Sequence, residues 1–205
     1  MFHDANDTLA PTPTAHTPRD EAQPLPGDLA MWFFIMAELL AFGVFFISYA
    51  FTRAHHVELF NITQATLNRT SGAINTVVLI TGSYFVVRAV EAIRHDHGIA
   101  CARWLWAGVA SGAVFAVIKL FEFADKIGAG INLSTNTFYM FYLSLTFFHF
   151  LHVLLGMIIL AACAIKAQRG GYSDTDHAGV ETGASYWHMV DLVWIVLFPL
   201  VYVLH

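Results

Sequence analysis

Five long apolar runs constrain this chain more than any other feature. They cover residues 29–52, 73–93, 104–123, 137–165 and 186–204, approximately. A helix needs about 20 predominantly apolar residues to cross the hydrocarbon core of a bilayer, and each run is about that long. Strands that span a membrane are shorter and alternate in polarity, which none of these runs does. The sequence therefore predicts an all-α, polytopic membrane protein built as a bundle of five transmembrane helices.

The composition excludes several other classes of protein. Of 205 residues, 57% are hydrophobic and only 12% are charged, whereas charged residues make up about a quarter of a typical soluble domain. The net charge of −5 argues against nucleic acid as a partner. The two cysteines, Cys101 and Cys163, are too few for a zinc or iron–sulfur site.

Residues 1–28 differ from the rest of the chain. They are rich in Pro, Thr, Asp and His, and their few apolar side chains predict a disordered cytoplasmic tail before a membrane domain of residues 29–205. Lys and Arg side chains favour a cytoplasmic N-terminus and a periplasmic C-terminus. With that orientation, six of them fall inside (Arg19, Arg88, Arg94, Arg103, Lys166, Arg169) and three outside (Arg53, Arg69, Lys126).

Three ionisable residues fall deep within predicted spans. Glu38 lies about nine residues into the first run, where an ionisable group costs at least ~2.5 kcal/mol unless it has a partner. His149 and His152 lie in "FFHFLHVLLGM" of the fourth run and, three residues apart, project from roughly one helix face. Because Glu38 is at similar depth, we expect the histidine pair to face Glu38 and to join the first and fourth helices.

The same three residues leave chemical alternatives open. Two histidines and one carboxylate are the composition of a non-haem iron triad, so a stand-alone metalloenzyme using Glu38, His149 and His152 is one alternative. Haem ligation is less favoured, because two histidines on one face cannot bind opposite sides of one haem. A proton relay would use the same residues but needs a path to both surfaces. A small transporter should show paired broken helices, and Pro199 is the only proline within a run.

Two further polar pairs and one group of small residues remain. Lys119 and Glu122, in "KLFEF", predict an interfacial ion pair near the outer boundary, with the lysine extended toward water. His188 and Asp191, in "SYWHMVDLVW", predict an Asp–His hydrogen bond on one face of the last helix. Small residues of the third run predict close helix packing (Gly108, Ser111, Gly112).

These motifs, taken together and in this order, resemble subunit III of the haem–copper oxidases. The stretches are "MAELLAFGVFFISYAF", "INTVVLITGS", "KLFEF", "FFHFLHVLLGM" and "SYWHMVDLVWIVLFPLVYVL", and the likeness runs from about residue 25 to the C-terminus. Long subunits III have seven helices, and this chain looks like a five-helix form without the first two. "LPGDLAMWFFIMAELL", "AHHVELFN", "GINLSTNTFYMFY" and "ETGASYWHMVDLVW" look most like the NorE-type protein associated with nitric oxide reductase.

The resemblance implies a subunit without redox centres of its own. Haem, metal and catalysis would reside in partner subunits, and the family binds phospholipid, supports proton uptake and protects the catalytic subunit. Glu38 matches the family's buried, carbodiimide-reactive glutamate, and the motif positions are matched by His149, His152, His188 and Asp191. Phe150 departs from the pattern, since a glycine is common between the two histidines. The absence of two helices also removes one wall of the family's lipid cleft.

The sequence thus predicts a non-catalytic accessory subunit in the bacterial inner membrane. Its expected partners are phospholipids and the catalytic haem-containing membrane subunit of nitric oxide reductase, whose assembly, stability or activity it would support. The alternative partner is a terminal cytochrome c or quinol oxidase.

Overall fold

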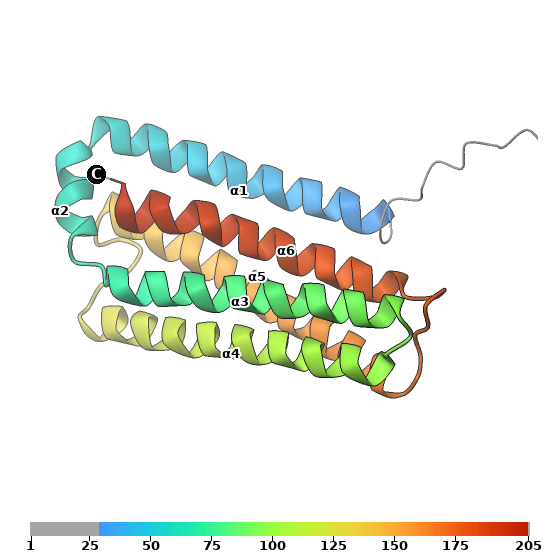
Figure 1. Ribbon diagram of the computed structural model, residues 1–205. Helices are drawn as coiled ribbons and strands as arrows, with labels where there is room; N and C mark the ends of the chain where they lie inside the picture. The colour runs from blue at the N-terminus through green and yellow to red at the C-terminus, as the bar shows by residue number, and fades with distance from the viewer. Residues whose placement is uncertain (1–28, 205) are drawn as a thin grey trace, which may run out of the picture.

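The computed structural model describes residues 29–204, in which every regular element is helical (Figure 1). The elements are α1 (Leu29–His55), α2 (Val57–Gln64), α3 (Arg69–Arg94), α4 (Gly98–Gly128), α5 (Thr137–Gln168), α6 (Ala178–Phe198) and the π-helical turn η1 (Pro199–Val203). Five helices are long and apolar enough to cross a membrane, the last being α6 with η1, which confirms the predicted fold class. The predicted tail, residues 1–28, lies outside the described residues.

Four of the long helices form a bundle, and the fifth lies against its outside. Around the bundle, α3 contacts α4, α4 contacts α5, α5 contacts α6, and α6 contacts α3. Helix α1 lies along α6 and also contacts α5 (Figure 1). We call the end where α1 begins the proximal end; it holds the α3–α4 and α5–α6 connections. The distal end holds α2, the α4–α5 connection and η1.

Several helices extend beyond the apolar runs that predicted them. Helix α4 covers Gly98–Gly128 rather than 104–123, and α6 begins at Ala178 rather than at 186. Hydropathy marks the part of a helix that suits lipid, whereas backbone hydrogen bonding continues through polar residues past the hydrocarbon. Asparagine side chains begin two helices by accepting from backbone N–H groups, Asn68 from Ser71 at 3.1 Å and Asn136 from Tyr139 at 2.8 Å.

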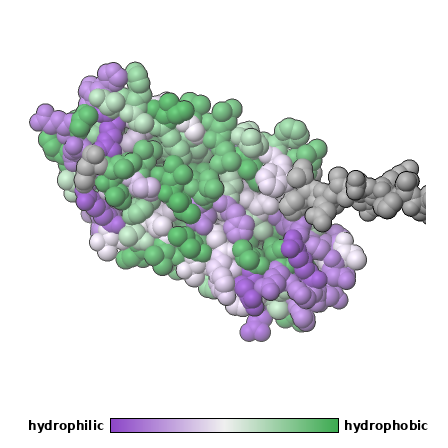
Figure 2. Space-filling view, turned by 45° about the horizontal axis from the view of Figure 1, so that its top comes forward, coloured by the Kyte–Doolittle hydropathy of each residue, from purple (hydrophilic) through white to green (hydrophobic). Residues whose placement is uncertain are grey.

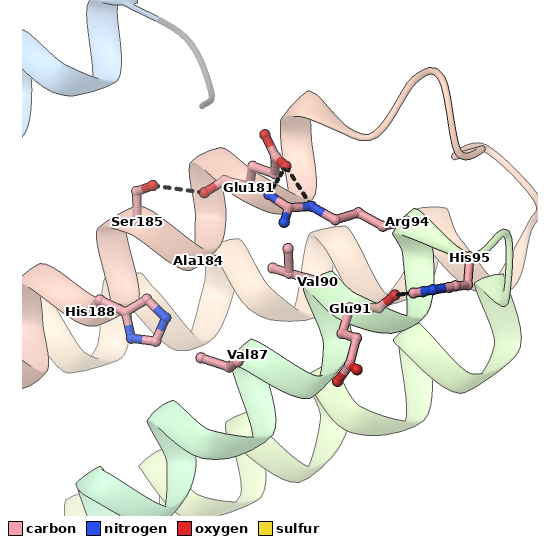
Figure 3. Close-up of a pocket in the computed structure, with 9 residues that line it drawn as sticks. All are labelled: Val87, Val90, Glu91, Arg94, His95, Glu181, Ala184, Ser185 and His188. Carbon is pink, nitrogen blue, oxygen red and sulfur yellow. Dashed lines mark hydrogen bonds and ion pairs between the residues drawn. The ribbon is translucent and has the colours of Figure 1, made fainter. Parts of the chain in front are cut away.

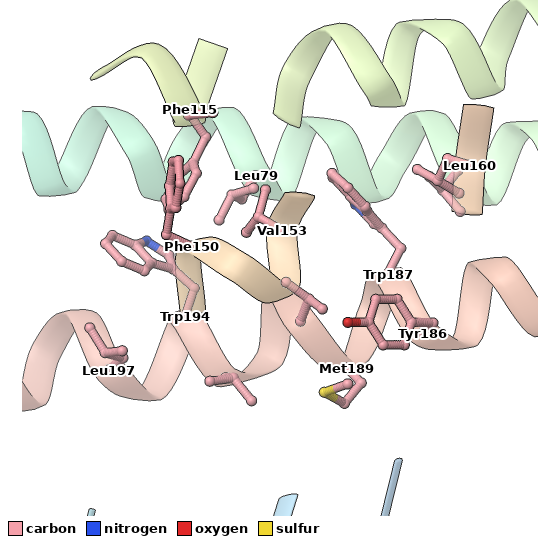
Figure 4. Packing of buried hydrophobic residues seen from close by; sticks show 14 of the residues in the cluster. Leu79, Phe115, Phe150, Val153, Leu160, Tyr186, Trp187, Met189, Trp194 and Leu197 are labelled. Atoms are coloured by element: carbon pink, nitrogen blue, oxygen red, sulfur yellow. The ribbon is translucent and has the colours of Figure 1, made fainter. Parts of the chain in front are cut away.

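Trp187 of α6, labelled in Figure 4, lies among buried hydrophobic residues. It occupies a slot made by glycines on three other helices. A Cβ atom would lie 2.8 Å from the Trp187 ring at Gly112, 3.1 Å at Gly156 and 3.3 Å at Gly82. Each glycine therefore provides space that the indole fills, and the bundle closes around one large side chain.

Small residues also bring α3 and α4 together. A Cβ atom at Gly108 would lie 3.1 Å from Val86 Cγ2, and the Ser111 hydroxyl donates to the carbonyl of Val78 at 2.7 Å. In lipid, close approach and interhelical hydrogen bonds drive association, because there is no hydrophobic force between helices. The predicted close packing of the third span is confirmed.

The outer surface suits a bilayer. Figure 2 shows hydrophobic residues over the middle of the molecule and hydrophilic residues gathered at the two ends. Helix α1 is the least covered span, with Phe33, Leu40 and Ile47 all at least 70% exposed. These three side chains therefore face lipid or a partner rather than the bundle.

Candidate functional site

Glu38 of α1 and His152 of α5 meet between their helices. His152 Nε2 lies 3.0 Å from Glu38 Oε2, and both side chains are largely covered. The other ring nitrogen, Nδ1, lies 2.7 Å from the carbonyl of Phe148, which can only accept, so Nδ1 carries a proton. The predicted contact of His152 with Glu38 is present in the structure.

His149 does not join this contact. It is fully buried, its ring lies 5.1 Å from that of Trp194 and 5.6 Å from that of Phe115, and neither ring nitrogen has a partner within the described residues. The expectation that both histidines face Glu38 is therefore wrong for His149. Three residues correspond to about 300° of rotation, and the remaining 60° places the two rings in different helix interfaces.

That separation also bears on the metal alternative. His149 packs against Trp194 and Phe115, whereas Glu38 lies against His152, so the three proposed ligands do not converge. Across residues 29–204, no group of three or more His, Cys, Asp or Glu side chains is arranged to hold a metal ion.

His188 and Asp191 of α6 meet through Ser83 of α3 rather than directly. Ser83 Oγ donates to Asp191 Oδ2 at 2.8 Å, and His188 Nδ1 lies 3.3 Å from Ser83 Oγ. Because the serine proton is directed at the carboxylate, His188 Nδ1 donates to Ser83. The expected direct Asp–His bond is wrong: both side chains reach across to α3, and the sequence motif gave no sign of Ser83.

A cavity leads toward this serine-bridged cluster from the proximal end (Figure 3). It measures about 460 Å³ and lies between α3 and α6. Arg94 and Glu181 are ion-paired at its mouth, with Nη2 and Oε1 2.7 Å apart. Val87 and Val90 form an apolar wall, and His188 lines the deeper part. His188 therefore borders this cavity although it lies ten residues into α6.

Lys119 and Glu122 of α4 form the predicted ion pair, but it is buried inside the bundle. Lys119 Nζ lies 3.0 Å from Glu122 Oε2, and the side chains are 0% and 7% exposed. The expectation of a lysine extended toward water is wrong, because the charge is satisfied inside. Tyr142 and Tyr202 each donate to Glu122 Oε1, at 2.6 and 2.7 Å, and Lys119 also donates to the Tyr202 hydroxyl at 2.6 Å.

Aromatic rings complete the environment of the ammonium group. Lys119 Nζ lies 5.0 Å from the ring centroid of Trp194 and 5.1 Å from that of Tyr202. Ring faces carry partial negative charge and so stabilise a buried cation. These aromatic residues lie on α6 and η1, so the cluster ties the end of the chain to α4 and α5.

The three polar contacts share one property: each joins side chains from different spans. Glu38–His152 links α1 to α5, the Ser83 cluster links α3 to α6, and the Lys119 cluster links α4, α5 and η1. They define a membrane protein whose buried polar groups hold helices together.

The sequence profile of the cytochrome c oxidase subunit III family matches residues 26–205. The chain belongs to the cytochrome c oxidase subunit III family. Family members are non-catalytic subunits of haem–copper oxidase complexes and work with catalytic subunit I. The resemblance seen in the sequence is confirmed at this level, and the NorE-type assignment stays a prediction.

Three similar proteins are named as subunits of cytochrome c or heme-copper oxidases. The chain is 33% identical over 186 residues to cytochrome c oxidase subunit 3 of Thermostichus vulcanus, covering 86% of each chain. It is 37% identical over 133 residues to cytochrome c oxidase subunit 3 of Synechocystis, covering 64% of this chain and 55% of that one. It is 30% identical over 192 residues to heme-copper oxidase subunit I+III of Aeropyrum pernix, covering 89% of this chain and 23% of that one.

Proposed function

We propose that this chain is the subunit III of a haem–copper terminal oxidase, packed laterally against the catalytic haem-bearing subunit and supporting its assembly and proton uptake. One observation on this member of the family carries the proposal. In the part of the chain that the structure describes, Glu38–His152 is the only contact between an ionisable side chain of α1 and one of the bundle. This contact supports a structural and protonic role for the glutamate.

The hydrogen bonds of His152 define what that contact can hold. Because Nδ1 donates to Phe148, the contact between Nε2 and Glu38 needs one proton: either a neutral carboxylic acid donates to neutral histidine, or protonated histidine donates to carboxylate. Both forms carry the same number of protons. One proton can therefore move between Glu38 on α1 and His152 on α5 without any uptake or release of protons by the pair.

The partner is tested by purification. Affinity purification of the full chain in mild detergent should bring down a haem-containing membrane subunit with oxygen-reducing activity, and haem and copper should follow that subunit when the chains are separated. Stoichiometric haem, iron or copper retained by this chain alone would contradict the proposal.

The second candidate is a NorE-type role with nitric oxide reductase. Its support is the set of sequence stretches that look most like that protein, beginning with "LPGDLAMWFFIMAELL". The size of the chain does not favour this candidate. The match with the Thermostichus vulcanus protein covers 86% of each chain, so the two chains are similar in length, and that relative is named an oxidase subunit. The same purification separates the two: the copurified enzyme reduces oxygen in the first case and nitric oxide in the second.

The proposed setting is the bacterial inner membrane, with the proximal end in the cytoplasm. The excess of Lys and Arg at that end supports this orientation, and phospholipids are the expected surroundings.

A further inference from the structure

The outer surface of α3 and α4 carries a hollowed region that the contacts described above do not use. At its centre lies Trp104 of α4, whose ring is 5.8 Å from that of Phe85 and nearly parallel to it, at 30°. The guanidinium carbon of Arg88 lies 5.8 Å from the centroid of the same indole. Trp104 is thus held in one orientation by two residues of α3.

Two cavities border this tryptophan. One of about 320 Å³ is lined by Ala100, Arg103, Trp104 and Ala107, and one of about 240 Å³ shares Ala100 and Trp104 and extends to α3. Ala100 and Ala107 lie one turn before and one turn after Trp104 on the same helix face. Their methyl side chains leave the space beside the indole unfilled. We call Arg88, Ala100, Arg103, Trp104 and Ala107 the Trp104 groove.

The charges at the groove are unbalanced. Arg88 Nη1 is paired with Glu91 Oε2 at 2.8 Å. Arg103 is exposed, and no hydrogen bond or ion pair of its guanidinium is found in the described part of the chain. The groove therefore presents one uncompensated positive charge beside an aromatic ring.

The depth of these residues matches the boundary of a bilayer. Arg103 lies five residues into α4 and Arg88 six residues before the end of α3. At 1.5 Å per residue these positions are about 7.5 and 9 Å from the helix ends. Trp and Arg at this level meet the polar part of a lipid, while Ala107 lies further toward the apolar middle.

The geometry points to a binding site for one anionic glycerophospholipid in the Trp104 groove. The phosphodiester accepts from the Arg103 guanidinium and is flanked by Arg88, since a guanidinium presents paired N–H groups that match phosphate oxygens. An acyl chain follows the hollow past Ala107. The basic residues fit a negative headgroup, and basic pockets between spans are a known form of lipid recognition.

Native mass spectrometry tests this inference on the full chain purified with its copurifying subunits. With phosphatidylglycerol added, one lipid should remain bound, and phosphatidylcholine should bind more weakly. Arg103→Gln should weaken phosphatidylglycerol binding about 5-fold, the factor that corresponds to about 1 kcal/mol for one arginine near a membrane surface. Arg169→Gln removes the same charge at the same end, directly after α5, and should leave binding unchanged.

A second variant tests the hollow without changing charge. Ala107→Phe should fill the space beside Trp104 and abolish retention of phosphatidylglycerol while the thermal unfolding temperature is maintained. Equal weakening by Arg103→Gln and Arg169→Gln would overturn the inference in favour of diffuse electrostatics. Unchanged binding in Ala107→Phe, or equal binding of the two lipids, would also overturn it. The measurement does not involve oxidase activity, so it stands apart from the proposed function.

Discussion

His152 Nε2 lies 3.0 Å from Glu38 Oε2, across the interface between α5 and α1, while Nδ1 of the same ring is held by the carbonyl of Phe148. The histidine is therefore fixed at both nitrogens. This contact joins the least covered span to the bundle, since α1 otherwise presents mainly apolar side chains.

Replacing Glu38 should separate a hydrogen-bonding role from a charge. In Glu38→Gln, the amide N–H group can donate to the unprotonated Nε2 of neutral His152, so we expect most of the assembled complex to be preserved. Glu38→Ala leaves the histidine unsatisfied, at a cost of ~1–3 kcal/mol. The measurement is the yield of complex and its unfolding temperature in detergent. Equal losses in the two variants would show that the negative charge is required.

The two histidines should respond differently to the same substitution. His149→Phe removes no hydrogen bond found in the structure and replaces a ring already packed between Phe115 and Trp194, so the unfolding free energy should change by about 1 kcal/mol or less. His152→Phe removes the contact with Glu38 and should destabilise the α1–α5 interface by ~1–3 kcal/mol. The comparison uses thermal unfolding of both variants. A greater loss in His149→Phe would reverse the assignment.

The buried Lys119–Glu122 pair should be sensitive to removal of one partner. Lys119→Met leaves a carboxylate in an enclosed site, which should destabilise the protein by about 3–5 kcal/mol. The double variant Lys119→Met/Glu122→Gln should recover most of that loss, because no charge remains. Lys126→Met, at the polar end of α4, is the control and should cost about 0.5 kcal/mol or less. A double variant as unstable as the single would show that the ion pair itself is needed.

The slot around Trp187 should not tolerate a larger residue. In Gly112→Ala, the new methyl would lie 2.8 Å from both Trp187 Cη2 and Met157 Cγ, so side chains must move. We expect a loss of about 1–3 kcal/mol, measured by thermal unfolding. Gly43→Ala on α1 is the matched control, because nothing lies within 4 Å of its added methyl. Similar behaviour of the two variants would contradict the close packing.

Cysteine labelling in whole cells tests the proposed orientation in the membrane. Asn132→Cys lies in the α4–α5 connection at the distal end and should react with a membrane-impermeant maleimide from the periplasm. Ser173→Cys, in the α5–α6 connection at the proximal end, should react only after the cells are opened. The native Cys101 and Cys163 are buried, which limits background labelling. Labelling in the reverse order would invert the topology.

Hydropathy and residue spacing predicted the membrane spans and one contact between them, but not how the other polar side chains pair. The five spans followed from length and apolar content, and the Glu38–His152 contact followed from comparable depth. The separation of His149 from His152 did not, because a rotation of 60° matters only once neighbouring helices are placed. Ser83 was missed for a similar reason, since a serine within an apolar run has no signal of its own.

The burial of Lys119 could not be predicted from its own helix, because one of its partners, Tyr202, lies in η1. Tyr142 and Tyr202 could be interpreted as boundary tyrosines, yet they donate to Glu122. Pro199 has no N–H group to continue the α-helical pattern, and the wider turn η1 follows, in which the N–H of Leu204 donates to the Pro199 carbonyl at 2.9 Å. That turn carries Tyr202 toward Lys119. Tyr202 in this turn thus completes the environment of a lysine that lies 83 residues earlier in the chain.

The separation of Glu38 and His152 along the chain sets an order for biogenesis. The two residues are 114 positions apart, and α1 is synthesised long before α5. At 5–20 residues per second, about 6–23 s pass between the appearance of the glutamate and that of its histidine. During that interval the carboxyl group has no partner from α5, so the first helix waits at the insertion site or in the bilayer until the fourth span arrives.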